Sequence, residues 1–394
     1  MAFRFDPADV RFLVNPDGAD ALAAAGALPL SDASLLADLG RVRAVAGERA
    51  GAVVETVRLR RKAVAKLGPD AAGWLLTDEA LQQATPGPVA EHRARRLAGV
   101  GEHDLTCSIG ADLAALASGP GLAVGSDLDP VRVRMARHNL LAAGLEPRVM
   151  VADALTRTTR GLLPYADPAR RDGTGRRITS ASTIPSIAEL DAAHADRPPV
   201  LRVPPGIDYD ALARPGEVEL VSLDGVAREA VLWPPELAGV GRRATVLSGA
   251  GDWEVTSDDP ADVPVAPAGE YLVDPDPAVV RAHLVRHYAA RHGLWLLDPH
   301  LAYLTGPAVP AGVRGFRVLD HAPYRERTVA QWARRDGIGT LEIKQRGTPI
   351  VPDQLRQRLR PALTGPTRYA ATLVVARIGR QAQAFWCRVV PSDP

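Results

Sequence analysis

The chain has 394 residues, of which 46% are apolar and 24% are charged. This is the composition of a globular protein, and it excludes wholesale disorder and a collagen-like repeat. Two cysteines, Cys107 and Cys387, are too few for a disulfide framework or a four-cysteine zinc site, so we expect a reducing, cytoplasmic environment. The sequence shows no signal-peptide pattern and no run of about 18 apolar residues, so neither secretion nor a membrane partner is expected.

The net charge of +1 is unevenly distributed. Residues 313–394 hold 14 arginines and Lys344 against six acidic residues, a net charge of +9 that leaves −8 for the rest of the chain. Arginine greatly outnumbers lysine throughout, which is typical of a high-GC genome, so the number of arginines alone indicates little. Their clustering near the C-terminus is better evidence of an anionic partner.

The first hundred residues predict helices. Apolar residues recur at three- and four-residue spacing in four segments: residues 19–25, 31–45, 50–67 and 78–97. Thr77 followed by Glu79 is a start signal for the last segment, and Pro86 and Pro88 interrupt it. We therefore predict an N-terminal helical region over residues 1–95.

Short apolar runs that alternate with helical segments follow, a pattern typical of parallel strands joined by crossover helices. The predicted strands are residues 103–107, 122–126, 148–151 and 200–203, and the predicted helices are residues 112–117, 130–144 and 184–193. Asp224-Gly225 then predicts a hairpin between residues 217–223 and 226–233. We predict a Rossmann-like, doubly wound α/β domain that ends in antiparallel strands, over residues 96–258.

The Pro- and Asp-rich stretch 258–267 is the best domain boundary. A helix is predicted over residues 277–292. Beyond it, the predicted strands are residues 340–344, 369–376 and 384–389, and the predicted helices are residues 328–335 and 352–359. This mixture predicts a ferredoxin-like or linking region over residues 268–320 and a small α+β domain over residues 321–394.

The most informative stretch is DLTCSIGAD, residues 104–112, which leaves a predicted strand, crosses a loop of small residues and enters a helix. Small side chains let a ligand approach the backbone of such a loop. Asp127 ends the next strand, where it is placed to accept hydrogen bonds from ribose hydroxyls, and Asp153 and Asp167 follow the third and fourth strands. Because these strand ends meet at one sheet edge, we predict a nucleoside-cofactor site there. Gly110 stands alone where a dinucleotide-binding dehydrogenase would have three glycines.

Residues 104–112, 127–129, 135–139, 153 and 167–168 resemble the successive motifs of class I S-adenosylmethionine-dependent methyltransferases, over roughly residues 96–250. The whole chain, with LQQAT at 81–85 and LEIKQRG at 341–347, resembles a bacterial group of these enzymes that ends in a THUMP-like domain, here residues 321–394. THUMP domains belong to RNA-modifying enzymes. The resemblance therefore implies an RNA methyltransferase that uses S-adenosylmethionine as cofactor and RNA as partner.

The resemblance also implies roles for particular residues. Those that would surround the methionine part of the cofactor are Asp104, Thr106, Cys107 and Gly110, with the ammonium against Asp104. Those that would hold its adenosine are Asp127 at the ribose, Leu128 on the adenine, and Asp153 with Ala154 at the adenine amino group. Asp167 and Pro168 would form the catalytic motif, which in amino-methylating enzymes holds an exocyclic amine with its lone pair toward the sulfonium methyl group.

The chain departs from the family pattern in three places. Ser108 and Ala111 replace two glycines of the loop, and Ala169-Arg170 replaces a Pro-aromatic pair, so no stacking platform for a flipped base is evident. Pro164 lies in a predicted central strand, where proline removes a ladder hydrogen bond.

Basic residues at two places are candidates for RNA contacts. Arg170 and Arg171 follow the catalytic motif and either contact phosphates or belong to a solvated loop. Lys344 and Arg346 lie on or just after a predicted strand of the basic C-terminal part and are candidates for binding the RNA backbone. No metal site is expected, since His283 and His287 lack a third ligand at suitable spacing.

Three functions remain open on the residues themselves. The first is an RNA methyltransferase that acts on an exocyclic base nitrogen. The second is a methyltransferase for a small metabolite, and the third is a non-catalytic protein that binds RNA and S-adenosylmethionine. Methylation of uracil C5 is disfavoured because it requires a nucleophilic cysteine near the base, and neither Cys107 nor Cys387 is placed for that.

Overall fold

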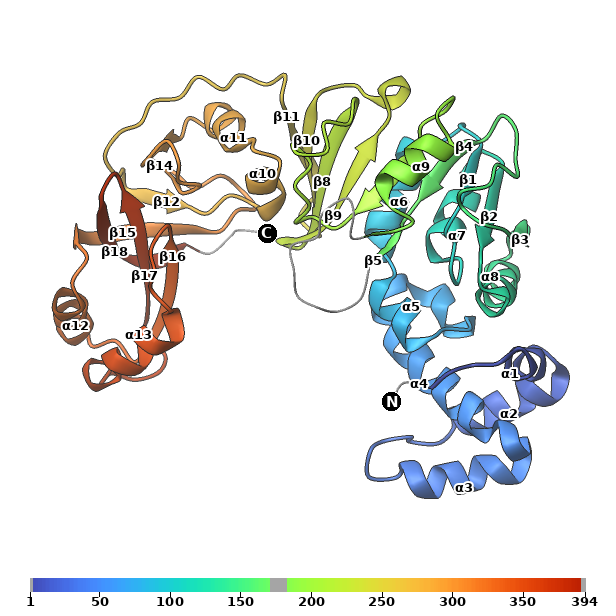
Figure 1. The fold of residues 1–394 in the computed structure, drawn as a ribbon. Helices are drawn as coiled ribbons and strands as arrows, with labels where there is room; N and C mark the ends of the chain where they lie inside the picture. Colours follow the sequence, from blue (N-terminus) through green and yellow to red (C-terminus); the bar gives the residue numbers. More distant parts are fainter. Residues whose placement is uncertain (1–2, 171–182, 391–394) are drawn as a thin grey trace. The chain divides into compact units, whose positions relative to one another are not determined.

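The computed structural model describes residues 3–170 and 183–390 (Figure 1). The chain forms two compact units: residues 1–216 with 228–238, and residues 217–227 with 239–394. The helical region and the parallel strands belong to the first unit. The division of the chain into four parts at residues 95, 258 and 320 stays a prediction.

The first unit begins with six helices, and the apolar spacing predicts all of them except the first, over residues 7–13. They are α1 (Pro7–Leu13), α2 (Pro16–Gly26), α3 (Leu35–Ala46), α4 (Ala50–Leu67), α5 (Asp78–Gln83) and α6 (Gly87–Arg96). Capping side chains fix the starts of α1 and α5: Asp6 and Asp9 form a capping box at α1, and the Thr77 hydroxyl accepts from the Ala80 amide at α5. The predicted interruption is confirmed: Pro86 lies between α5 and α6, and Pro88 lies in the first turn of α6.

The sheet of the first unit has the strand order β9-β7-β4-β1-β2-β3. Its strands are β1 (Glu102–Asp104), β2 (Ala123–Asp127), β3 (Val149–Val151), β4 (Leu163–Ala166), β7 (Val200–Val203) and β9 (Val226–Trp233). The five strands from β7 to β3 are parallel, and β9 runs antiparallel to β7. The helices between them are α7 (Ala111–Ala117), α8 (Pro130–Ala142) and α9 (Ile187–Ala193). This is the Rossmann-like sheet with a final antiparallel strand that the sequence predicts.

Pro164 lies in the central strand β4 at no cost to the hydrogen-bond ladder. The Leu163 amide donates to Gly101 on the β1 side, so the alternation along β4 turns the nitrogen of Pro164 toward β7. Pairing of β4 with β7 begins only at Tyr165. The missing N–H of proline therefore faces a position where no ladder bond is made.

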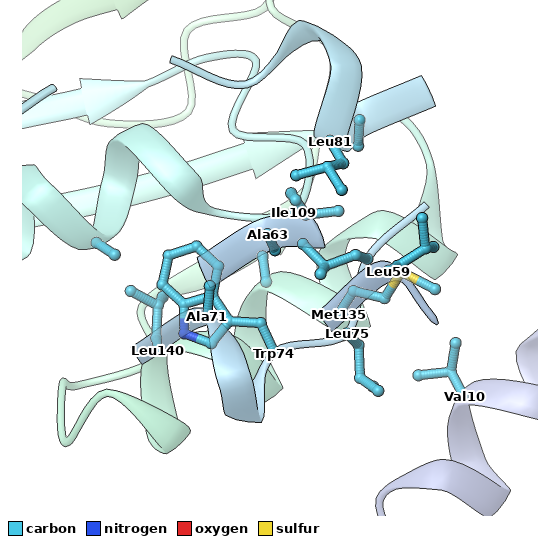
Figure 2. Close-up of a cluster of buried hydrophobic side chains, with 14 of the residues drawn as sticks. Val10, Leu59, Ala63, Ala71, Trp74, Leu75, Leu81, Ile109, Met135 and Leu140 are labelled. Carbon is cyan, nitrogen blue, oxygen red and sulfur yellow. The ribbon is translucent and has the colours of Figure 1, made fainter. Parts of the chain in front are cut away.

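One hydrophobic core joins the N-terminal helices to the sheet of the first unit (Figure 2). Its side chains come from α1, α4, α5 and α8 and from the loops before α5 and after β1, among them Val10, Leu59, Leu81, Met135 and Ile109. The fully buried Asn139 of α8 binds both regions, since its amide donates to the carbonyls of Leu75 (2.9 Å) and Ile109 (2.8 Å) and accepts from the Leu75 amide. The helical region is thus part of the wall behind the loop after β1.

The second unit contains a seven-stranded sheet in the order β13-β14-β12-β15-β18-β17-β16. Its strands are β12 (Tyr271–Val273), β13 (Trp295–Leu296), β14 (Leu304–Gly306), β15 (Gly315–Pro323), β16 (Thr340–Arg346), β17 (Ala370–Ile378) and β18 (Gln381–Val390). One apolar cluster places α12 (Glu326–Arg335) and α13 (Pro352–Leu359) on one face of this sheet, and a second cluster covers the other face. The unit also contains β8 (Glu217–Leu223), β10 (Arg242–Leu247) and β11 (Trp253–Thr256).

Two predictions in this part of the chain are wrong in detail. The single helix predicted over residues 277–292 is two helices, α10 (Pro277–Arg281) and α11 (Val285–Arg291), because His283 between them has a φ of +60°. Strand β15 was not predicted, since a register shift between Val318 and Asp320 interrupts its alternation. The predicted turn at Asp224-Gly225 is confirmed, with φ values of +50° and +73°.

Candidate functional site

Four acidic residues stand where four neighbouring parallel strands end, as the sequence predicts. Asp104 and Asp127 are the last residues of β1 and β2, Asp167 directly follows β4, and Asp153 lies two residues beyond β3. The strands are adjacent in the order β4-β1-β2-β3, so these carboxyl ends share one edge of the sheet. This is the edge at which open α/β sheets bind their ligands.

The loop from β1 to α7 is built tightly against its neighbours. Gly110 has a φ of +82°, and a Cβ there would lie 3.2 Å from the Cβ of Ala136. Ser108, which stands where the family pattern has a glycine, still adopts a φ of +49°, and its amide donates to the Asp127 carboxylate (3.0 Å). The loop therefore keeps a glycine-like backbone despite the substitution.

Cys107 is a packing residue of this loop. Its side chain is buried, its amide donates to the Ser126 carbonyl (2.8 Å), and a Cβ added to Gly125 would lie 3.1 Å from its sulfur. Burial, with Asp104 and Asp127 nearby, raises the pKa of the Cys107 thiol well above its usual value. A thiol held neutral in this way is a poor nucleophile.

Asp104 is an almost fully buried carboxyl group, with 1% of its surface exposed. Its Oδ1 accepts from the Thr106 amide (3.1 Å). The pKa of Asp104 is well above its usual value, because the group is buried and because Asp112 and Asp167 are close. A buried acid among other acids favours a cationic ligand, which would stabilise its charged form.

Asp127 is oriented by two backbone amides. Its Oδ2 accepts from Ser108 and its Oδ1 from Asp129 (2.8 Å), so the carboxylate is fixed at the end of β2. Leu128 next to it is 68% exposed, which is unusual for a leucine and leaves an apolar side chain free to pack on a planar ligand. The exposed Asp153 accepts from the Leu155 amide (2.9 Å), and the buried His194 hydrogen-bonds to the Ala154 carbonyl (2.8 Å).

Asp167 is connected to the loop after β1 and to an arginine. Its amide donates to the Thr106 hydroxyl (2.8 Å), and its carboxylate forms an ion pair with Arg202 of β7. Burial raises the pKa of Asp167, with Arg202 acting against the rise. Pro168, which follows it, is buried.

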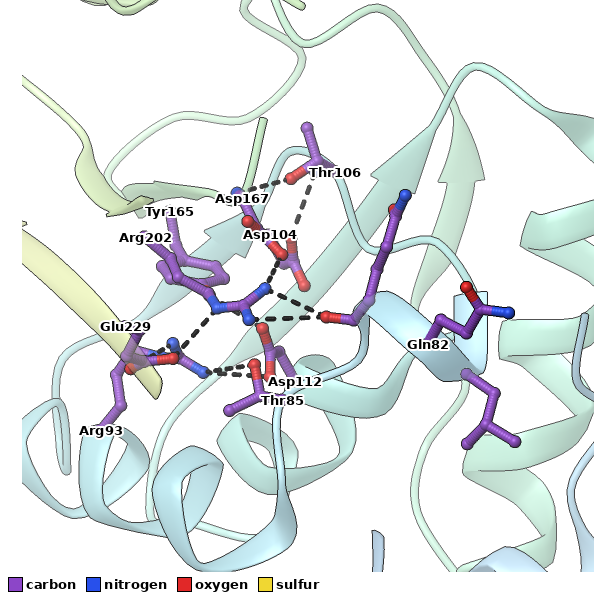
Figure 3. A network of polar contacts seen from close by, with 12 residues as sticks. Gln82, Thr85, Arg93, Asp104, Thr106, Asp112, Tyr165, Asp167, Arg202 and Glu229 are labelled. Carbon is purple, nitrogen blue, oxygen red and sulfur yellow. Dashed lines mark hydrogen bonds and ion pairs between the residues drawn. The ribbon is translucent and has the colours of Figure 1, made fainter. Parts of the chain in front are cut away.

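Behind Asp167 lies a network of buried charges that the sequence analysis missed (Figure 3). Its members come from the α5–α6 segment, α7, β4, β7 and β9: Thr85, Arg93, Asp112, Tyr165, Arg202 and Glu229. Arg93 binds Asp112 and Glu229 (3.0 Å each), and the Tyr165 hydroxyl donates to Asp112 (2.8 Å). Arg202 interrupts the otherwise apolar strand β7, and this charged residue inside an apolar run was the available signal.

The four candidate RNA-binding residues do not lie together in one site. Arg170 belongs to the two-residue strand β5 (Ala169–Arg170), which pairs with β6 (Thr183–Ile184), while Arg171 lies outside the described residues. Lys344 and Arg346 lie together on β16, where both form ion pairs with Asp274, at 2.6 and 2.7 Å. The structure thus brings Lys344 and Arg346 together, but an acid already neutralises part of their charge.

Other arginines of the second unit are more open. Five are exposed and form no ion pair within the described part of the chain: Arg325, Arg327, Arg334, Arg360 and Arg380. Arg368 lies beside the half-exposed ring of Tyr369, at 5.1 Å from its centre. These side chains present positive charge that no neighbouring acid cancels.

In residues 3–170 and 183–390, no three His, Cys, Asp or Glu side chains are grouped so that they could hold a metal ion. Over the same stretches, no helix is both long and apolar enough to cross a bilayer.

Comparison with known proteins identifies the family. The chain is 47% identical over 357 residues to an uncharacterized S-adenosylmethionine-dependent methyltransferase of Mycobacterium tuberculosis, found in two strains; the match covers 88% of this chain and 99% of each relative. This chain belongs to the S-adenosylmethionine-dependent methyltransferases. A family model described as THUMP domain-like matches residues 313–389, and one described as a domain of unknown function matches residues 6–63.

A solved structure from Porphyromonas gingivalis W83, described as a methyltransferase, shares the fold of this methyltransferase over its length. The two are 20% identical with a TM-score of 0.69, and the match covers 99% of this chain and 100% of the other. The enzyme is therefore an α/β methyltransferase with a C-terminal THUMP-like domain, and S-adenosylmethionine is its cofactor. The surplus of acids around Asp104 fits a cofactor that carries an ammonium and a sulfonium group.

Proposed function

We propose that this methyltransferase transfers a methyl group to an exocyclic base nitrogen of RNA. The observation that carries the proposal is the placement of Asp167: its carboxylate follows β4, is 32% exposed, and is tied to the loop after β1 through Thr106. A carboxylate held there can accept a hydrogen bond from an amine. Ring carbon atoms offer no such donor, so an amine fits the site better.

The cofactor contacts are proposed on the residues that share this edge. Asp104 would bind the ammonium, with Thr106, Cys107 and Gly110 around the methionine part. Asp127 would bind the ribose hydroxyls, Leu128 would pack on the adenine, and Asp153 with Ala154 would contact the adenine amino group. The backbone amides that already orient Asp127 support this assignment, because they fix the direction in which its carboxylate accepts.

S-adenosylmethionine supplies a methyl group bound to a positively charged sulfur. Asp167 accepts from the substrate amine and turns its lone pair toward that methyl group, with the backbone beside Pro168 as a second acceptor. The bound cofactor would give up its methyl group to the amine nitrogen and leave as a neutral thioether, and the surplus N–H proton of the methylated amine would pass to solvent. The residues lower the barrier through alignment and exclusion of water, and no strong base is needed.

RNA is proposed as the substrate on two further observations. One is the THUMP domain-like match over residues 313–389, and the other is the set of exposed, unpaired arginines in the same unit. Arg170, Arg171, Lys344 and Arg346 are proposed to contribute phosphate contacts. Phosphate binding by such side chains orders an RNA strand without reading its sequence.

The test incubates the purified enzyme with labelled S-adenosylmethionine and total RNA from an unmodified source, followed by digestion to nucleosides. We expect label in one N-methylated nucleoside, and its loss in Asp167→Ala with cofactor binding largely retained. Asp17→Asn, an exposed acid on α2, is the matched control. Label found only in small molecules would indicate a metabolite substrate. Cofactor binding without any methyl transfer would indicate a non-catalytic protein that binds S-adenosylmethionine.

A further inference from the structure

Asp167 and Arg202 lie next to each other because their strands are neighbours. Ala166 of β4 pairs with Leu201 of β7, so the residues that follow them emerge side by side at the carboxyl edge of the sheet. There Nη1 of Arg202 donates to Oδ2 of Asp167 (Figure 3). Arg202 is only 15% exposed, so water screens this ion pair weakly.

The guanidinium of Arg202 is held on its other sides as well. Its Nε donates to Glu229 of β9 (3.0 Å), and both Nη atoms approach the carbonyl of Gln83 at the end of α5 (3.4 Å). The guanidinium thus bridges the catalytic motif, strand β9 and helix α5. It cannot turn away from Asp167 without breaking the contact with Glu229.

Glu229 is itself fixed by a second arginine. Arg93 of α6 binds the other oxygen of Glu229 (3.0 Å) and also Asp112 of α7, and both Arg93 and Glu229 are 1% exposed. The guanidinium of Arg93 lies over the ring of Tyr165, 4.9 Å from its centre. Because these buried charges have so many partners, they favour a single arrangement. Glu229 is part of it and therefore fixes the position of the Arg202 guanidinium.

We propose that Arg202 is a positioning residue of the catalytic motif: its guanidinium fixes the Asp167 carboxylate as an ionised hydrogen-bond acceptor in one orientation. The inference rests on the proposed role of Asp167. The Thr106 hydroxyl holds the backbone of Asp167, and Arg202 holds one carboxylate oxygen, which leaves the other oxygen for the substrate amine. Asp167 then aligns the amine and does not remove its proton.

Two facts support this assignment. Burial raises the pKa of Asp167 and Arg202 opposes that rise, so without Arg202 the carboxyl group would be protonated over a wider range of pH. A protonated carboxyl group would donate a hydrogen bond from one oxygen and would no longer be a uniform acceptor. The chain also lacks the Pro-aromatic pair of the family pattern after Asp167. The ion pair with Arg202, on the neighbouring strand β7, orients the Asp167 carboxylate instead.

The first experiment needs no methyl acceptor. Protein labelled with ¹³C at the aspartate carboxyl carbons is titrated by NMR, and the Asp167 signal is identified as the one missing from Asp167→Asn. We expect the Asp167 midpoint to rise by one pH unit or more in Arg202→Gln, and to stay near the parent value in Arg202→Lys. Equal midpoints in the parent protein and Arg202→Gln would overturn the inference, whether or not RNA is the substrate.

The second experiment is a double-mutant cycle on methyl transfer. Arg202→Gln should lower kcat about 10–100-fold and leave the Kd for S-adenosylmethionine unchanged within about twofold. In an Asp167→Asn background the same change should have no further effect on the residual rate, because Arg202 acts through Asp167. An equal loss in both backgrounds would assign Arg202 a general structural role.

Two variants separate positioning from folding. Arg202→Lys keeps the charge and should remain folded while losing the contact with Glu229, so kcat falls and the midpoint of Asp167 does not. Arg197→Gln removes a partly exposed ion pair with Glu236 and a hydrogen bond to the Gly161 carbonyl in the same unit, and should change neither readout. A parent enzyme that transfers no methyl group to RNA would refute the proposed function alone, since the NMR titration still decides the role of Arg202.

Discussion

The two charged clusters of this enzyme have opposite surpluses. Around the end of β4, four acids face two arginines: Asp104, Asp112, Asp167 and Glu229 against Arg93 and Arg202. On β16, two cations face one acid, since Lys344 and Arg346 share Asp274. The excess of acids suits a cationic cofactor, and the excess of cations suits an anionic polymer. Although most charges within each cluster are paired, each cluster keeps a net charge opposite to that of its proposed ligand.

Burial is the second difference between the clusters. Arg93 and Glu229 are 1% exposed, whereas Lys344 and Arg346 are 24% and 29% exposed. A buried pair costs much when one partner is removed, because the other charge remains without water. A partly exposed pair can exchange its acid for phosphate at little cost. The first cluster is therefore a scaffold, and the second is available for exchange.

The largest expected effect comes from removing the centre of the buried cluster. Arg93→Met leaves Asp112 without its ion-pair partner and Glu229 with Arg202 alone, and should lower the stability of the first unit by about 3–5 kcal/mol. Arg358→Met, which removes an exposed pair with Glu326 in the second unit, should change stability very little, because water screens that pair. Denaturant titration followed by circular dichroism measures both. If the two variants lost similar amounts of stability, burial would not explain the strength of the first cluster.

The cofactor side of the comparison is tested with Asp104→Asn. Loss of the buried carboxylate should weaken binding of S-adenosylmethionine about 30-fold or more in calorimetry, corresponding to about 2 kcal/mol. Because the pKa of Asp104 is raised, the parent protein should bind more tightly as pH increases and the carboxyl group ionises. The affinity of Asp104→Asn should be flat over the same range. An unchanged affinity in the variant would move the ammonium contact elsewhere.

The ends of the four strands were predictable from the sequence because they depend on local pattern. Asp127 follows the apolar start of its strand, and the small residues after Asp104 predict the loop. The partners of Asp167 were not predictable, because Arg202 and Glu229 reach it only through strand order, 35 and 62 residues along the chain. Pairing across a sheet is set by tertiary packing, which a single sequence does not display.

The N-terminal helices illustrate the same limit. Their spacing predicts amphipathic helices, and these form. The spacing does not show that Asn139 would bind the Leu75 and Ile109 backbones, or that Arg93 of α6 would join the buried charges behind Asp167. A region that the pattern presents as separate is therefore structurally continuous with the site.

The first unit also contains a buried acid, Glu102, that has no arginine partner among the described residues. Glu102 is 3% exposed, its Oε2 has no hydrogen-bond partner among the described residues, and burial raises its pKa to about 7. Since the folded pKa is above the unfolded value, Glu102 lowers stability as pH rises from about 4.5 through 7. Glu102→Gln should therefore be more stable than the parent protein at pH 8 by about 2 kcal/mol, with little difference at pH 4. Thermal unfolding at both pH values, with the exposed Glu91→Gln as control, checks this.

The smallest expected effect concerns the exchange of Asp274 for phosphate. Lys344→Ala with Arg346→Ala should weaken RNA binding by about 1–2 kcal/mol and reduce the slope of log affinity against log salt by about 1.4, the value for two phosphate contacts on a single strand. Asp274→Asn should act in the opposite direction, since it frees both cations without removing either. Filter binding at several salt concentrations measures the slopes. If Asp274→Asn weakens binding as well, the cluster on β16 supports the fold through the rings of Phe316 and Tyr303, and the exposed arginines carry the RNA contact.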